Sequence, residues 1–104
     1  ATSNIPANDP GTPWHLHTNE DEWIIVISGA LRVDAFDKQN LLEPGEQLKI
    51  PRGEWHRWMP ASETPSHVLF LFSPGGIERM FREMAQNPDK TGAIREKYGT
   101  VFLD

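Results

Sequence analysis

The sequence predicts an all-β fold: an antiparallel double-sheet barrel of the jelly-roll type, followed by one or two short helices. Its apolar stretches are short, as at residues 22–28, 31–36 and 67–72, and turns that contain glycine or proline separate most of them. A helical spacing of apolar residues begins only after residue 76. Short strands at regular spacing, joined by such turns, are typical of antiparallel sandwiches and barrels.

Residues 14–17 and 22–28 are predicted to form the first two strands of the barrel. Side chains alternate between the two faces of a strand, and along residues 22–28 both faces are apolar. A strand of this kind is covered on both sides. The barrel interior would cover one face, and either a second subunit or the C-terminal helix would cover the other.

Turns and further strands follow. Residues 29–30, with glycine first, predict a two-residue hairpin into residues 31–36, and residues 37–40 form the next turn. Pro44-Gly45 is the signature of a type II turn. Two more strands are expected at residues 55–59 and 67–72, and the latter closes the barrel.

The chain changes character after residue 76. Apolar residues recur there at spacings of three and four, which predicts an amphipathic helix that ends at Pro88. Residues 91–98 would form a second short helix, and residues 100–103 a tail that packs or pairs at an edge. The apolar stripe expected to dock the first helix on the barrel consists of Ile77, Met80, Phe81 and Met84.

The chain is expected to fold as one domain with three parts, since 104 residues suffice for a single core. Residues 1–13 contain three prolines and would form an extended N-terminal arm. Residues 14–72 would form the barrel. Residues 73–104 would form a C-terminal helical segment and tail packed on the barrel.

Composition excludes several kinds of partner. The net charge is −5, from 15 acidic and 10 basic residues, and the basic residues form no stripe. Nucleic acid and membranes are therefore not expected as partners. No apolar run in these 104 residues approaches the length that spans a bilayer, and neither a membrane span nor a secretory signal is expected. The chain contains no cysteine, which fits the reducing cytoplasm, and a cytoplasmic location is expected.

Four residues predict a metal centre. His15 and His17 would point the same way from one strand, Glu22 opens the next strand, and a bend at residues 51–53 delivers His56. Three imidazoles and one carboxylate suit one divalent transition metal ion, either Fe, Mn, Co, Ni, Cu or Zn. An octahedral ion held by these four ligands would keep positions open for a substrate.

The spacing of these residues resembles the two motifs of the cupin superfamily. His-x-His-x(4)-Glu-x(6)-Gly ends at Gly29, and Gly-x(5)-Pro-x-Gly-x(2)-His runs from Gly45 to His56. The resemblance covers about residues 11–72. It departs from the family pattern at Gly11, which lies closer to the histidine pair than usual, and at Pro60, which stands where the second motif usually ends in Asn. Both departures concern turns rather than ligands.

The end of the chain adds a narrower resemblance. Residues 73–83, Ser-Pro-Gly-Gly-Ile-Glu-Arg-Met-Phe-Arg-Glu, look like the tail of small single-domain cupins similar to quercetin dioxygenases. The resemblance implies an O2-dependent dioxygenase that acts on an aromatic or enolic small molecule. His15, His17 and His56 would then be metal ligands. Glu22 would be either a fourth ligand or, when detached, the catalytic base that deprotonates the substrate hydroxyl.

Two other functions stay open on the same residues. A cupin of this size could bind a small acid, sugar or aromatic compound without turning it over. A metal-assisted isomerase, cyclase or lyase would use the same ligands without O2. In each case the pocket around the metal is expected to be apolar. Its predicted lining consists of Ile24, Val26, Leu48, Trp58 and one face of residues 67–72.

Residues outside the motifs have simpler interpretations. Trp23 and Trp55 would lie on outer faces, where a homodimer interface explains such large aromatics. We expect structural or surface positions for the remaining histidine, for two arginines and for the only tyrosine. These residues are His67, Arg52, Arg57 and Tyr98. The two acidic residues that precede Glu22, Glu20 and Asp21, are expected in solvent, although either could replace Glu22 as a ligand if the register of the strand is shifted by one or two residues.

Overall fold

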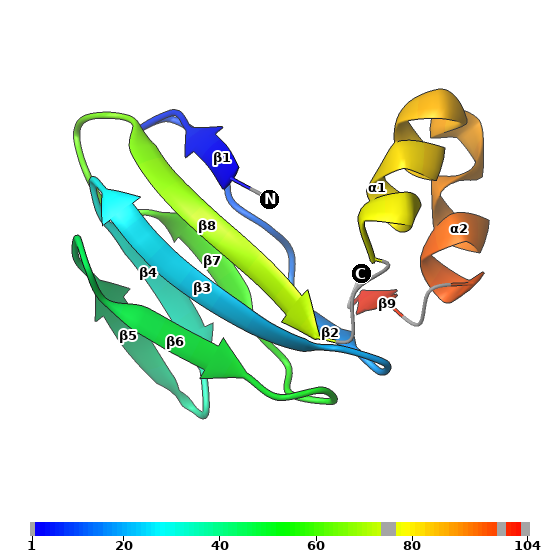
Figure 1. Cartoon of the computed structure of the whole chain (residues 1–104), viewed down its shortest axis with the longest axis horizontal. Coiled ribbons are helices and arrows are strands. Elements are labelled where there is room, and N and C mark those ends of the chain that lie inside the picture. The colour runs from blue at the N-terminus through cyan, green and yellow to red at the C-terminus, as the bar shows by residue number, and fades with distance from the viewer. Residues whose placement is uncertain (1, 74–76, 98–99, 103–104) are drawn as a thin grey trace.

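A computed structural model describes residues 2–73, 77–97 and 100–102 of the chain. Two antiparallel sheets face each other and form a flattened barrel (Figure 1). The larger sheet has the strand order β1-β8-β3-β6, with β1 at Thr2–Ile5, β3 at Asp21–Ser28, β6 at Gln47–Ile50 and β8 at Ser66–Ser73. The second has the order β5-β4-β7, with β4 at Leu31–Ala35, β5 at Lys38–Leu42 and β7 at Arg57–Pro60. The predicted all-β jelly-roll fold is confirmed.

The core lies between the two sheets. Inward-facing side chains from both sheets are fully buried there, among them Ile24 and Val68 of the larger sheet and Leu31 and Val33 of the smaller one. Burying an aliphatic side chain of this size contributes roughly 1.5–3 kcal/mol. These apolar contacts hold the two sheets together, and the ladder hydrogen bonds join the strands within each sheet.

The predicted hairpin at Gly29-Ala30 is wrong. β3 pairs with β6 and β8, whereas β4 pairs with β5 and β7, so these two residues carry the chain from one sheet to the other. Gly29 has a φ of 81°, and a Cβ at this position would collide with Ser66. The Ser66 hydroxyl bonds to both the backbone N–H and the carbonyl of Ala30, at 3.1 Å each.

The two-residue hairpin lies one strand later, at Phe36-Asp37 between β4 and β5. Ala35 pairs with Lys38, and both turn residues have positive φ, 56° and 59°. Positive φ at both central positions defines a type I′ turn. The turn therefore begins before the predicted residues 37–40. The type II turn is confirmed, with a φ of 88° at Gly45 and the Glu46 N–H donating to the Glu43 carbonyl at 2.9 Å.

The N-terminal residues join the larger sheet. β1 pairs antiparallel with β8 at its edge, and Ile5 is buried in the core. Part of the expected arm is thus a strand. The division of the chain into arm, barrel and helical segment remains a prediction.

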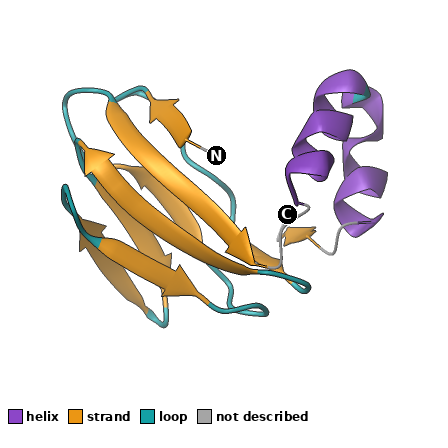
Figure 2. Ribbon diagram, viewed as in Figure 1, coloured by secondary structure: helices purple, strands orange, loops and turns teal. Residues whose placement is uncertain are grey.

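The C-terminal part contains the two expected helices, α1 at Ile77–Gln86 and α2 at Thr91–Lys97, with a 3₁₀ turn at Pro88–Lys90 between them. They lie side by side at one end of the barrel (Figure 2). Strand β9, Thr100–Phe102, then pairs antiparallel with β2, His15–His17. The tail therefore pairs at an edge, as expected. No helix in the described ranges is long and apolar enough to cross a membrane.

Apolar side chains connect the helices to the barrel. Met80 of α1 is buried against Ile94 of α2, and Phe72 of β8 and Met84 pack against this pair. Of the predicted stripe, Met80 and Met84 take part in this contact with Phe72 of the barrel. Tyr98 lies outside the described residues.

Candidate metal centre

The structure brings together the four residues predicted to bind a metal. Their ligand atoms all lie within 4.8 Å of one another, and all four residues are buried. His15 and His17 come from β2 and Glu22 from β3. His56 directly precedes β7. A group of this size matches the space around one coordinated ion.

Backbone pairing explains how the second motif reaches the first. His15 and His56 form an antiparallel bridge in which each N–H donates to the carbonyl of the other at 2.9 Å. The Gly53 N–H donates to the His17 carbonyl at 2.8 Å. Because side chains alternate along a strand, Leu16 points away and the two histidines of β2 face the same space.

Hydrogen bonds fix the tautomers of two histidines. Nδ1 of His15 lies 2.8 Å from the Pro13 carbonyl, and Nδ1 of His56 lies 2.9 Å from the Glu54 carbonyl. A carbonyl oxygen only accepts hydrogen bonds, so each Nδ1 carries the hydrogen. Each Nε2 then presents its lone pair to the site, as metal-binding histidines do.

The Glu22 carboxylate lies close to the imidazoles of His56 and His17. Its Oε1 is 2.9 Å from Nε2 of His56 and 3.6 Å from Nε2 of His17. A carboxylate oxygen and a lone pair on Nε2 repel each other at this distance unless a proton or a cation lies between them. The donor set therefore fits a divalent transition metal ion.

Burial keeps two ligands neutral. It lowers the pKa of both His15 and His17 to about 4, and electrostatic repulsion from His56 acts in the same direction. Near neutral pH neither imidazole is protonated. Their lone pairs are then available to a metal ion without competition from protons.

A cavity of about 420 Å³ opens onto the group. Apart from three of the four ligands, its lining is mostly apolar and includes Trp58, Phe70 and Phe72 of the barrel. Ser3 and Thr12 add the only other polar side chains among the described lining residues. Such a cavity, apolar with a few polar groups at one end, is typical of a small-molecule site.

Part of the predicted lining is wrong. Ile24 and Val26 are fully buried in the core and do not reach the cavity, and Leu48 packs against the same core. In their place α1 contributes Met80 and Phe81. Their helical spacing marked them as an apolar stripe, but it did not show that this stripe also faces the metal group.

The other polar residues near the motifs lie outside the group. Asp21 accepts hydrogen bonds from the backbone N–H and the guanidinium of Arg52, at 2.9 and 3.2 Å. Arg57 lies on the opposite face from His56, as alternation predicts, and pairs with Asp34. Glu20 is buried, with 7% of its surface exposed, so its expected place in solvent is wrong.

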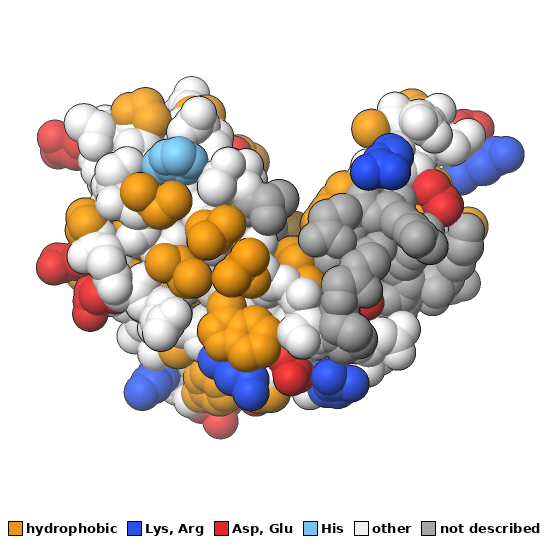
Figure 3. Space-filling model, viewed as in Figure 1, with side chains coloured by type: hydrophobic (Ala, Val, Ile, Leu, Met, Phe, Trp, Pro, Cys, Tyr) orange, Lys and Arg blue, Asp and Glu red, His pale blue; other side chains and the backbone are white. Residues whose placement is uncertain are grey.

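The outer face of the larger sheet carries an apolar patch over β3 and β8 (Figure 3). Ile27 and Leu71 are 48% and 44% exposed there, and Trp23 is half-buried with the Lys49 amine 5.2 Å from its ring centre. His67 lies on this face of β8 and takes no part in the metal group.

Known proteins match both the sequence and the fold. The uncharacterized protein YdbB of Bacillus subtilis (strain 168) is 42% identical over 45 residues, which are 42% of this chain and 40% of that protein. Oxidoreductase AOL_s00215g277 of Arthrobotrys oligospora is 32% identical over 72 residues, 67% of this chain and 28% of that protein. The chain thus spans less than half the length of these relatives.

A similar fold is found in a solved structure from Klebsiella pneumoniae, that of an uncharacterized conserved protein with a double-stranded beta-helix domain. The two structures match over 99% of this chain and 71% of the Klebsiella chain. Its TM-score is 0.68 at 14% identity, so this likeness shows the fold alone. The model of the family described as the cupin domain matches residues 1–72, which include both histidine motifs and all of the two sheets except the last residue of β8. By this match the chain belongs to the cupin family.

Proposed function

We propose that this chain is a metal-dependent cupin dioxygenase of the quercetinase-like type, acting on an aromatic or enolic small molecule with O2. The observation that supports this most directly is a group of four buried ligand atoms, within 4.8 Å of one another, at one end of an apolar cavity. The similarity to an oxidoreductase over 72 residues points to the same class of reaction.

The resident ion would be held by His15, His17, His56 and Glu22. These donors suit Fe, Mn, Co, Ni or Cu, and also Zn. When bound, such an ion supplies a Lewis acid for a substrate oxygen and, if redox-active, a site for O2 chemistry. The protein holds the imidazoles of His15 and His56 in the correct tautomer through the Pro13 and Glu54 carbonyls.

Glu22 is the proposed catalytic base when its carboxylate is detached from the ion. It is 3% exposed and lines the cavity, so a substrate hydroxyl near the group would meet its carboxylate without intervening bulk water.

The lining favours an unphosphorylated aromatic substrate. Trp58 and Phe70 lie with ring centres 5.7 Å apart and present apolar surface to the cavity. None of the described lining residues is lysine or arginine, so a phosphate would have no cationic side chain to bind it there. The Thr12 hydroxyl oxygen accepts a hydrogen bond from the backbone N–H of Trp58 at 3.0 Å. The hydroxyl hydrogen of Thr12 would then donate to a substrate oxygen.

Oxygen uptake tests the proposal. Protein purified without chelator should contain about one equivalent of metal, and the variant with His15, His17 and His56 changed to Ala should contain none. The intact protein, loaded separately with Fe, Mn, Co, Ni or Cu, is then assayed for O2 consumption on flavonols and enediols. Turnover that proceeds equally well without O2 would support an isomerase, cyclase or lyase instead. A ligand that binds and is recovered unchanged would support a binding protein.

We also propose a cytoplasmic homodimer in which the apolar patch over β3 and β8 is covered by a second copy. An exposed group of large apolar side chains is costly in water, and Trp55 adds a further 38% exposed aromatic. Sedimentation velocity across a wide concentration range tests the assembly. A single monomeric species at high concentration would contradict it.

A further inference from the structure

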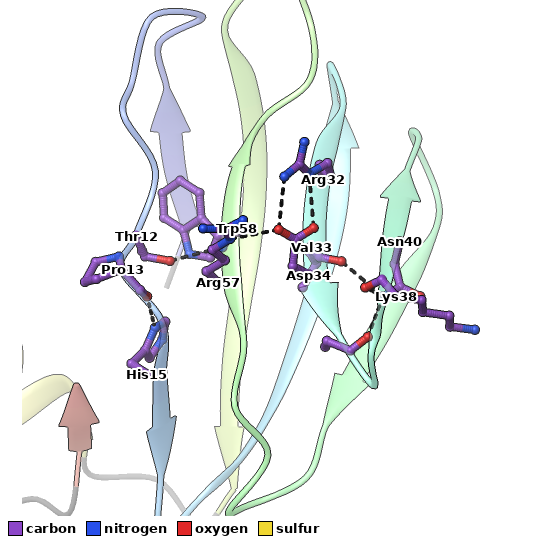
Figure 4. A network of polar contacts seen from close by, with 11 residues as sticks. Thr12, Pro13, His15, Arg32, Val33, Asp34, Lys38, Asn40, Arg57 and Trp58 are labelled. Atoms are coloured by element: carbon purple, nitrogen blue, oxygen red, sulfur yellow. Dashed lines mark hydrogen bonds and ion pairs between the residues drawn. The ribbon is translucent and has the colours of Figure 1, made fainter. Parts of the chain in front are cut away.

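A row of charged and aromatic side chains crosses the outer face of the barrel directly behind the metal group. It runs from Arg32 and Asp34 on β4 to Arg57 on β7 and ends at Trp14, the residue before β2 (Figure 4 shows the three charged members). The row is distinct from the cavity, since none of its members lines it.

Asp34 anchors this row. It is only 5% exposed, and a buried carboxylate is tolerated only where strong donors satisfy it. Arg32 binds it through two nitrogens at 3.0 Å each, and Nε of Arg57 donates to Oδ2 at 2.8 Å. This bond holds the Arg57 guanidinium in one orientation.

The held guanidinium lies over Trp14. The carbon at its centre is 4.8 Å from the middle of the indole ring, a distance typical of a cation–π contact. Asp34 and Arg57 are also cross-strand partners in the β4–β7 ladder, so the contact is tied to a rigid sheet rather than to a loop.

Trp14 and Arg57 lie on the outer face of the same two chain segments that carry the ligands His15 and His56 on their inner face. His15 and His56 are bridged across the two strands, and in an antiparallel pair Trp14 and Arg57 are the next residues opposite each other. Because side chains alternate between faces, the indole and guanidinium lie outside while the two imidazoles lie inside.

Trp14 also shares a peptide bond with Pro13. The Pro13 carbonyl accepts the hydrogen bond from Nδ1 of His15 at 2.8 Å, and this bond sets the tautomer of that ligand. The Pro13–Trp14 peptide is planar, so this carbonyl and the Trp14 N–H move together, and a Trp14 side chain held on the outer face restricts how the plane can turn about the Trp14 N–Cα bond.

We propose that Arg57 and Trp14 are positioning residues of the metal centre, and that their contact on the outer face sets the ring orientation and tautomer of His15 opposite His56. The inference rests on the proposed metal centre, although the orientation of His15 is a property of the metal-free protein too. Partners that orient a metal-binding histidine through its second nitrogen typically contribute about 10–100-fold to metal affinity.

Co²⁺ binding to four variants tests this inference. Arg57→Ala removes the contact, Trp14→Leu keeps apolar volume but removes the ring, and Arg57→Lys keeps a cation. Arg32→Ala is the matched control, because it removes an arginine from the same carboxylate without touching Trp14. Affinity is measured by competition with a fluorescent chelator, and ligand geometry by the visible absorption of the Co²⁺ complex. The tautomer of His15 in the metal-free protein is read from imidazole ¹H–¹⁵N correlations.

We expect Arg57→Ala and Trp14→Leu each to weaken Co²⁺ binding by about tenfold and to change its absorption, with substantial recovery in Arg57→Lys and little change in Arg32→Ala. In the metal-free protein the first two should lose the pure Nδ1–H form of His15. Unchanged affinity and tautomer in Arg57→Ala, or an equal loss in Arg32→Ala, would overturn the inference. If Arg57→Ala does not fold, Trp14→Leu decides by the same criteria. If the unmodified protein binds no metal, the proposed function fails, and the tautomer measurement alone decides the role of this pair.

Discussion

Nε2 of His56 lies 2.9 Å from Oε1 of Glu22, although the two residues are 34 positions apart in the chain. Nδ1 of the same imidazole is committed to the Glu54 carbonyl, so the Nε2 side must carry either a proton or a metal ion to be stable beside the carboxylate. This contact joins the two histidine motifs. Removal of the Glu22 charge is therefore the most direct test of metal binding.

Glu22→Gln should abolish stable metal binding while leaving the fold intact. The amide is the same size as the carboxylate but carries no charge to neutralise a divalent ion. We expect affinity to fall by more than the roughly 10–100-fold that loss of an orienting partner costs, because a ligand itself is removed. Isothermal titration with Co²⁺ measures this. Asp21→Asn is the control, since Asp21 is adjacent in sequence but pairs with Arg52.

Metal removal should lower stability by mass action. An ion that binds only the folded state adds about 2.7 kcal/mol to the free energy of unfolding at a free concentration 100 times its dissociation constant. Chelation should therefore shift urea unfolding to a lower midpoint. The variant without the three histidines should show the same midpoint with and without chelator. A midpoint that chelator leaves unmoved in the intact protein would count against a resident metal.

The four metal ligands could be predicted from the sequence, whereas the order in which the strands join the two sheets could not. Ligand spacing along one strand follows from local geometry, which is why His15 and His17 face the same space. Which sheet a strand joins depends on distant partners. Gly29-Ala30 reads equally well as a hairpin and as a crossing between sheets, and only the pairing of β4 with β5 and β7 decides.

The hairpin at Phe36-Asp37 and the helical wall of the cavity were also not predicted, because local sequence patterns do not indicate them. Phe36 adopts a positive φ of 56° although turn statistics favour asparagine, aspartate or glycine there, so its hairpin carried no recognisable signal. Met80 and Phe81 reach the cavity because α1 lies against the end of β8, a relation between segments that periodicity does not report.

The stability contributed by Asp34 should be lost in acid. Hydrogen bonds from Arg32 and then Arg57 lower the pKa of this carboxyl below its ordinary value of 3.8, against the opposing effect of burial. The unfolded chain therefore binds a proton more readily than the folded one, and stability falls as the pH drops below about 4. The free energy of unfolding of Asp34→Asn should differ most from that of the intact protein near neutral pH. A difference that stays constant down to pH 3 would show that Asp34 makes no charge-dependent contribution.

Gly29→Ala should destabilise the barrel, while Gly92→Ala should not. Gly29 has a φ of 81° and its added methyl group would collide with Ser66, whose hydroxyl holds Ala30 in place. We expect a loss of about 1–3 kcal/mol, as for other strained backbone positions. Gly92 is the second residue of α2, where an added methyl group would meet no atom within 4 Å, so alanine there should leave the free energy of unfolding unchanged or slightly raised. Chemical denaturation of both variants measures the contrast.

Phe81→Ala should weaken substrate binding with little effect on stability. The side chain is 50% exposed but lines the cavity, and its ring lies 6.4 Å from that of Phe72. Loss of this apolar surface should cost on the order of 1 kcal/mol of binding, which raises the dissociation constant of an aromatic ligand about fivefold.

Leu41→Ala is the matched control for this variant. Leu41 is 56% exposed on β5 and lies outside the cavity lining, so its loss should leave ligand affinity unchanged. Both variants should retain Co²⁺ binding, because neither touches the four ligands. If Phe81→Ala binds the aromatic ligand as tightly as the unmodified protein, α1 does not form a wall of the working site, and the ligand must rest on the barrel residues Trp58 and Phe70 alone.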